Sequence, residues 1–151
     1  YAVLGLAHQR AGRLEDAVTQ YNKSISLSNR SYEVHNNLGL VYQDMGKYEA
    51  ALAAFSEAIE RAPENRDLQI NRRQLTLRAQ GMSMHDRYAV LVTEYPEQPQ
   101  LWRAYASELA ERGRLEEALE ACQMVLKLDP SDHQVLRNIG QLKARIAART
   151  D

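Results

Sequence analysis

Histidine side chains can ligate a metal ion or transfer protons. The four histidines of this chain are His8, His35, His85 and His133. No two stand four residues apart and none belongs to an HExxH motif, so the ligand spacing of a zinc site is missing. The sequence also lacks a glycine-rich phosphate loop and a GxSxG motif. We therefore expect no metal, no cofactor and no catalytic activity in this chain.

Composition narrows the classes of partner. The 151 residues are 44% hydrophobic and 26% charged, which is typical of an ordinary globular domain. The formal net charge of −1 and the lack of a dense Lys/Arg block argue against nucleic acid. Apolar runs are short and interrupted by charge, so we expect no membrane insertion. One cysteine cannot form an internal disulfide and favours a soluble, cytoplasmic protein, although the compartment stays open.

An internal repeat organises the chain. The similar phrases AGRLEDA, MGKYEAA and RGRLEEA contain Gly12, Gly46 and Gly113. The first two glycines are 34 residues apart and the last two are 67 apart, which is close to two periods. Between the four prolines, nearly all segments follow the 3.6-residue apolar period of helices. The pattern predicts an all-α protein built from helix pairs.

The repeat register gives the remaining reactive side chains structural roles. Cys122 falls in the slot that holds Tyr21 and Phe55 in other units, which predicts a buried thiol instead of a nucleophile. Glu116 and Glu117 fall in the first turn of a predicted helix, where carboxylates interact favourably with the helix dipole. We therefore assign no catalytic residue.

A 34-residue helix-turn-helix period resembles the tetratricopeptide repeat family. In the second unit, the matching residues are His35, Leu38, Gly39, Tyr42, Ala51, Phe55, Ala58 and Pro63. The resemblance implies a right-handed superhelical solenoid of antiparallel helix pairs, forming a single domain over 1–151. The expected repeats span 1–31, 32–65, 66–98 and 99–132, and a capping helix spans 133–148.

Small residues explain how such helices approach one another. A single helix pair cannot bury its apolar face alone, so the core forms by stacking neighbouring pairs. Gly39 and Ala51 are expected to let the two helices of the second repeat pack closely. Ala58 is expected to allow the same close packing against the next repeat. Tyr42 and Phe55 are expected to fill the space that is left.

The third unit departs from this pattern. Asn71 and Arg72 replace the Leu-Gly pair, Met84 replaces the small alanine, and Gly81 comes two residues later than a turn glycine should. The unit is either a degenerate, loosely packed repeat or one that presents Arg72 and neighbouring arginines to an acidic partner. The first explanation is the simpler one, because degenerate repeats are common in such arrays.

The end helix also has two explanations. It has an apolar stripe on one side and polar residues on the other, which fits a helix that covers the last repeat. Leu136 and Gly140 also occupy repeat slots, so this segment could instead be the first helix of a fifth repeat. The sequence begins at Tyr1 within a helical pattern, which indicates that it is part of a longer chain.

By resemblance, the first helices of the repeats line a concave groove that binds a protein or peptide. The residues expected to bind it are Asn36, Asn37, Leu40, Gln43, Arg73, Gln74, Arg103 and Ser107. Asn138 repeats the slot of Asn37 in the end helix. Amide side chains can both donate to and accept from an extended backbone, and arginines pair with carboxylates.

The predicted function is a protein-protein interaction scaffold that binds an extended, polar or mildly acidic segment. The carboxylate-binding clamp of some family members is not matched, because Ala2 and Leu6 stand where it needs Lys and Asn. Self-association through the repeat ends is a further expectation. The alternative is a regulatory or substrate-docking array of a larger enzyme, for example a glycosyl- or sulfotransferase, whose catalytic domain lies outside this sequence.

Overall fold

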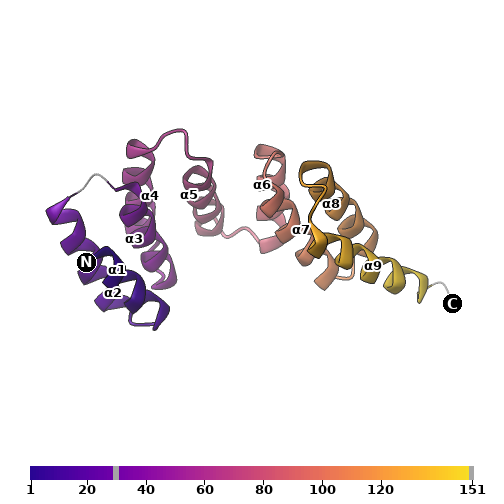
Figure 1. Ribbon diagram of the computed structural model, residues 1–151, viewed down its shortest axis with the longest axis horizontal. Helices are drawn as coiled ribbons and strands as arrows, with labels where there is room; N and C mark the ends of the chain where they lie inside the picture. The colour runs from indigo at the N-terminus through magenta and orange to yellow at the C-terminus, as the bar shows by residue number, and fades with distance from the viewer. Residues whose placement is uncertain (29–30, 150–151) are drawn as a thin grey trace. The chain divides into compact units, whose positions relative to one another are not determined.

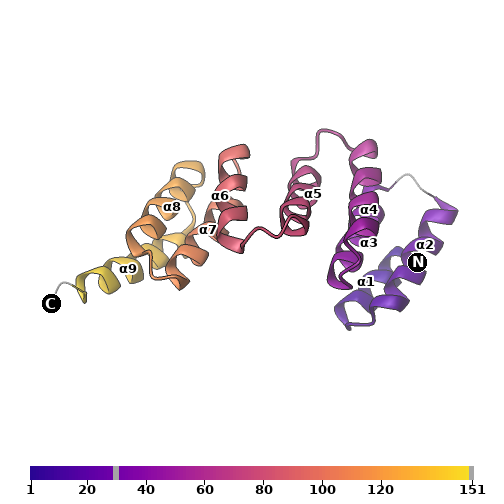
Figure 2. The same cartoon turned by 180° about the vertical axis from the view of Figure 1, so that it is seen from behind.

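A computed structural model describes residues 1–28 and 31–149 of the chain. Within these ranges the protein consists of nine α-helices and contains no strand (Figures 1 and 2). The helices are α1 (Ala2–Arg10), α2 (Leu14–Leu27), α3 (Tyr32–Asp44), α4 (Tyr48–Arg61), α5 (Arg66–Ala79), α6 (Met84–Glu94), α7 (Pro99–Glu111), α8 (Leu115–Leu128) and α9 (His133–Ala147). The prediction of an all-α fold built from stacked helix pairs is confirmed.

The helices form two compact units, Tyr1–Gln80 and Gly81–Asp151. In the first unit α1 packs on α2, α2 on α3, α3 on α4, and α4 on α5. In the second unit α6 packs on α7, α7 on α8, and α8 on α9. Consecutive helices are therefore neighbours in space within each unit, as expected when each helix pair buries its apolar face against the next.

Glycines in the left-handed region end the first helices of the pairs. Gly46 has φ +73° two residues after α3 ends, a conformation that costs other residues energy. Gly81 has φ +80° and performs the same role, although its position in the sequence is late. The reason is that α5 continues to Ala79, so Gly81 again follows the helix end by two residues.

Aromatic rings packed on glycine backbone form the centre of the first unit. The ring of Phe55 on α4 lies against Gly39 on α3, and the ring of Tyr21 on α2 lies against Gly5 on α1. Both rings are fully buried. Ala51 is also fully buried and belongs to the same cluster as Phe55. The predicted role of small residues in bringing the helices together is confirmed for Gly39 and Ala51, and Gly5 shows the same arrangement.

Helix α6, the second helix of the predicted third repeat, lacks this buried pattern. Met84 is 50% exposed, although the corresponding alanines Ala17, Ala51 and Ala118 are fully buried. Tyr88, in the slot of Phe55, is only half-buried. The departure of this unit from the repeat pattern therefore has a counterpart in its packing. The boundary between the two units, after Gln80, falls within the same predicted repeat.

Candidate functional site

The residues predicted to bind a peptide fall into two groups, one in each unit. Asn36, Asn37, Leu40 and Gln43 lie on α3, and Arg73 and Gln74 lie on α5. Arg103 and Ser107 lie on α7 of the second unit. All eight side chains are at least partly exposed, so each group has a polar face open to solvent.

In the first unit, two of the predicted amides are engaged in contacts between helices. Asn71 Nδ2 on α5 donates a hydrogen bond of 3.0 Å to Asn36 Oδ1 on α3. Asn37 lies close to the side chain of Tyr21, whose pKa is raised by burial and lowered in part by this amide. These amides therefore help to hold neighbouring helices together.

In the second unit, the predicted arginine forms an ion pair within the chain. Arg103 Nε lies 2.7 Å from Asp132 Oδ2. The same carboxylate caps α9, because Asp132 Oδ1 accepts a 3.0 Å hydrogen bond from the backbone N–H of Val135. This backbone bond and the nearby Arg103 hold the pKa of Asp132 below its usual value, against an opposing effect of burial. The sequence signal for Asp132 was its place as an N-cap between Pro130 and a helical pattern.

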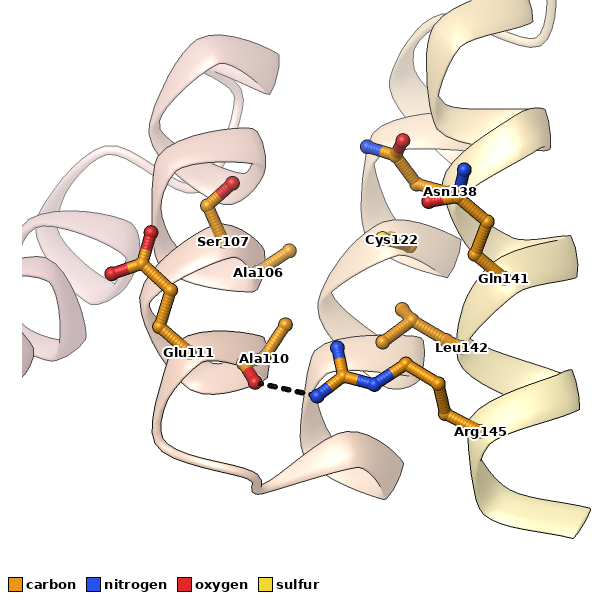
Figure 3. A pocket seen from close by; sticks show the side chains of 9 residues that line it. All are labelled: Ala106, Ser107, Ala110, Glu111, Cys122, Asn138, Gln141, Leu142 and Arg145. Atoms are coloured by element: carbon orange, nitrogen blue, oxygen red, sulfur yellow. Dashed lines mark hydrogen bonds between the residues drawn. The ribbon is translucent and has the colours of Figure 1, made fainter. Parts of the chain in front are cut away.

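A pocket of about 430 Å³ lies among α7, α8 and α9. Figure 3 shows its lining residues, which are Ala106, Ser107, Ala110, Glu111, Cys122, Asn138, Gln141, Leu142 and Arg145. Of the residues predicted to bind a peptide, Ser107 lines this pocket. Asn138, which shares the repeat slot of Asn37, lines it as well.

The pocket has an apolar floor and a polar rim. Ala106, Cys122 and Leu142 are buried at its floor. The rim side chains supply a hydroxyl from Ser107 and an amide from Asn138, and Figure 3 shows the latter reaching from α9 towards α7. Five of the nine lining residues are polar or charged, so the pocket offers hydrogen-bonding and charged groups around a small apolar floor.

An arginine closes one end of the pocket. Arg145 Nη2 on α9 donates a 3.3 Å hydrogen bond to the backbone carbonyl of Ala110 near the end of α7 (Figure 3). Arg149 Nη1 similarly donates 3.0 Å to the carbonyl of Gly113. These two contacts satisfy carbonyls in and just after the last turn of α7 and fix α9 beside it.

The thiol on the floor of the pocket is suited to packing. Cys122 is 2% exposed, which confirms the prediction of a buried thiol. Burial, together with the negative charge of Asp132, raises the pKa of Cys122 above its usual value. A raised pKa leaves less of the reactive thiolate at neutral pH. Cys122 stands in a repeat slot that holds aromatic rings in other units, but the sequence alone does not show that a pocket opens there.

Two further properties concern the described part of the chain as a whole. Its histidine, cysteine and acidic side chains include no group of three or more that could hold a metal ion. Among the helices from α1 to α9, none is both long and apolar enough to cross a membrane.

Comparison with known proteins places this architecture in a family. Family models described as tetratricopeptide repeat or TPR repeat match residues 5–46, 32–65 and 99–142. Human protein O-mannosyl-transferase TMTC1 is 25% identical over 142 residues, which cover 90% of this chain and 15% of that protein. Bovine BBSome complex member BBS4 is 24% identical over 147 residues, covering 93% of this chain and 27% of that protein. The chain thus spans less than a third of either relative.

Solved structures show the same fold at low sequence identity. YrrB, a TPR protein with an unusual peptide-binding site, is 22% identical with a TM-score of 0.56, covering 99% of this chain and 77% of YrrB. Pseudomonas aeruginosa PilF is 20% identical with a TM-score of 0.63, covering 98% and 68% of the two chains. The first TPR of Spaghetti (RPAP3), bound to the HSP90 peptide SRMEEVD, is 19% identical with a TM-score of 0.51, covering 78% and 94%. With its helix pairs, its repeat period and these family matches, the chain belongs to the tetratricopeptide repeat family.

Proposed function

We propose that this chain is a protein-interaction module that binds a peptide segment of a partner protein on the face formed by α7 and α9. The observation that carries the proposal is the pocket among α7, α8 and α9, with its apolar floor and polar rim. The peptide-binding sites of YrrB and of the RPAP3 repeat supply a precedent in the same fold. The residues predicted on α3 and α5 would form a second contact face.

The preferred segment is extended, polar and mildly acidic. Asn138 and Gln141 on the rim can each donate to a backbone carbonyl and accept from a backbone N–H. An acidic residue of the segment would compete with Asp132 for Arg103, so the acidic preference is modest. Where such charged contacts form at an exposed surface, screening by salt weakens them.

A second candidate is a docking array of a larger enzyme. The observation that favours it is the match to TMTC1, a protein O-mannosyl-transferase of which this chain would correspond to a small part. In that case the same pocket would bind a protein substrate or a regulatory segment. The sequence of the whole gene distinguishes the two candidates, because a catalytic domain in the same chain supports the second.

Selection from a random peptide library tests the proposal. The 151-residue chain is used as bait, and the affinity of enriched peptides is measured by isothermal titration calorimetry. The double variant Ser107→Ala/Gln141→Ala removes two rim groups and is expected to weaken binding about tenfold, as the loss of one or two neutral hydrogen bonds implies. Lys143→Ala, an exposed change on α9 away from the pocket, is the matched control.

The result that contradicts the proposal is equally concrete. If the double variant remains folded by circular dichroism and binds every enriched peptide as tightly as the Lys143→Ala control does, the face formed by α7 and α9 is not the binding site. Failure to enrich any peptide above the background of an empty bait counts against the proposal as well.

A further inference from the structure

The surroundings of the pocket recur at the start of the same chain. Turn glycines Gly12 and Gly113 are 101 residues apart. The first residues of α2 and α8 are separated by the same 101 positions, and so are their last residues. The same separation also relates the last residues of α1 and α7, and the first residues of α3 and α9. The counterparts of the pocket residues are therefore Gly5, Leu6, Gln9, Arg10, Tyr21, Asn37, Leu40, Val41 and Asp44.

In the first unit, a tyrosine of the chain fills this position. Tyr21 reaches from α2 and is fully buried. Its ring lies so close to Gly5 that a Cβ there would stand 2.7 Å from Tyr21 Cδ1. The Tyr21 hydroxyl donates a 3.0 Å hydrogen bond to Gln9 Oε1, and the amide of Asn37 on α3 lies close enough to lower the pKa of Tyr21. The position thus accommodates a phenol ring together with its hydroxyl.

In the second unit, the ring is absent. Cys122 stands in place of Tyr21, and Ala106 stands in place of Gly5. A ring placed as Tyr21 is would meet the Ala106 methyl, so a ring bound in this pocket must lie farther from α7 than Tyr21 lies from α1. The pocket between α7 and α9 remains open to such a ring. The amide of Asn138 lines it, in the place where Asn37 contacts Tyr21.

We propose that this pocket receives one tyrosine side chain of the bound segment, an inference that rests on the function proposed above. The ring enters between α7 and α9 and covers Ala106, Cys122 and Leu142. Its hydroxyl pairs with Asn138, the counterpart of Asn37, because Ala110 stands in place of Gln9 and offers no side-chain partner. A rigid aromatic ring with a polar tip suits an apolar floor below a wet rim. Side chains of this kind, buried in a pocket, carry most of the affinity at many interfaces.

Aromatic probes test the pocket without knowledge of the partner. 4-Methylphenol, the side chain of tyrosine as a small molecule, is titrated into the isotope-labelled 151-residue chain and followed by NMR. We expect saturable shifts of amide signals around Ser107, Cys122 and Asn138. Toluene, which lacks the hydroxyl, is the comparison probe and is expected to bind more weakly at the same place. A titration with 4-methylphenol that leaves these signals unmoved overturns the proposal.

Asn138→Ala tests the hydroxyl contact separately. Asn138 is partly exposed, and its Oδ1 accepts a 3.0 Å hydrogen bond from Gln134 Nε2 on the same helix. The variant is expected to weaken 4-methylphenol roughly three- to tenfold, which corresponds to one neutral hydrogen bond, and to leave toluene unchanged. Equal effects on both probes would show that the amide does not recognise the hydroxyl and would overturn the assignment of tyrosine.

A filling variant provides the third arm. The double change Ala106→Gly/Cys122→Tyr recreates the Gly5 and Tyr21 pair within α7 and α8, so it has a template in this chain. We expect the variant to melt as cooperatively as the parent and to lose 4-methylphenol binding. Undiminished binding by a folded variant overturns the proposal, and the Asn138→Ala arm decides the matter if the variant does not fold.

The outcome is distinguishable from that of the proposed function. If the enriched peptides lack tyrosine but bind through Ser107 and Gln141, the proposed interaction module stands and only the proposed tyrosine pocket is wrong. Peptides that share a tyrosine, and that lose affinity with Ala106→Gly/Cys122→Tyr, would support both.

Discussion

The ring of Phe55 is seated on the backbone of Gly39, so closely that a Cβ at position 39 would lie 2.6 Å from Phe55 Cε1. A glycine in the middle of a helix ordinarily costs roughly 0.5–1 kcal/mol relative to alanine. Here the glycine allows α3 and α4 to approach with a fully buried ring between them. The contact between the Phe55 ring and the backbone therefore explains why a residue of low helix propensity occupies position 39.

The first prediction is that Gly39→Ala destabilises the chain. The added methyl would force Phe55 to move, and overpacking of a core costs about 1–3 kcal/mol. Replacing glycine by alanine within a helix gains only about 1 kcal/mol. The variant is therefore destabilised when the overpacking cost lies in the upper part of its range. Gly140→Ala is the matched control, because Gly140 lies within α9 and no atom of the described neighbouring residues comes within 4 Å of the place its methyl would take. The control is expected to gain roughly 0.5–1 kcal/mol.

Urea denaturation of the two variants measures this difference. Gly39→Ala should unfold at lower urea than the parent and Gly140→Ala at slightly higher urea. A Gly39→Ala variant as stable as Gly140→Ala would show that the ring yields without cost and that the close contact is not required.

The architecture could be predicted because it depends on a repeated local pattern. Gly39 and Phe55 each stand in a slot that recurs after 34 residues, as Gly5 and Tyr21 show, and repeated slots reveal which helices must touch. The late position of Gly81 is also visible in the sequence. The turn keeps its geometry because α5 continues to Ala79, and the repeat pattern does not predict that length.

The candidate site was harder to predict because it depends on volume and on competing contacts. Cys122 could be assigned to an aromatic slot, but the sequence did not show that replacing a ring by a thiol opens a pocket instead of letting the helices close up. The pairing of Arg103 with Asp132 depends on how α9 lies beside α7, which is a tertiary property. The chemistry of the rim therefore required the structure.

The second prediction concerns the register of α4. Ala51 is fully buried beside Phe55 and Leu75, and Ala53 is exposed on the same helix. Ala51→Trp is expected to lower stability by about 1–3 kcal/mol or more through overpacking, and Ala53→Trp to have little effect. Thermal melting followed by circular dichroism makes the comparison. Equal melting temperatures would contradict the assignment of Ala51 to a close-approach slot.

The third prediction concerns the reactivity of Cys122. Burial raises its pKa above the usual 9.0, so the folded chain holds less thiolate than the unfolded chain at pH 8 to 9. Iodoacetamide should therefore react more slowly with the folded chain, and the rate should keep rising beyond pH 9.0. The chain unfolded in urea is the reference, since Cys122 is the sole cysteine. A rate that levels off below pH 9.0 in the folded chain would refute the raised pKa.

The fourth prediction concerns acid stability. The pKa of Asp132 is lowered in the folded chain, chiefly by the backbone N–H of Val135, so its ionised form stabilises the fold above pH 3.8. This contribution is lost as the pH falls through the lower, folded pKa. Asp132→Asn should therefore unfold more readily at pH 6 and show a weaker acid dependence than the parent. Glu60→Gln, a change at an exposed residue of α4, is the control.

Melting temperatures measured from pH 6 to pH 2 decide this point. If the curves of Asp132→Asn and Glu60→Gln coincide over the whole range, the cap and the ion pair with Arg103 add no pH-dependent stability.

The exchange of Tyr21 for Cys122 at equivalent positions has a genetic consequence. Codons for tyrosine and phenylalanine each become cysteine codons through a single nucleotide change. In a duplicated array, one such change in one copy removes a ring from that copy and leaves the rings of the others in place, as Tyr21 and Phe55 illustrate. A lineage can thereby gain a cleft in one repeat while the sister copies keep the remainder of the protein folded.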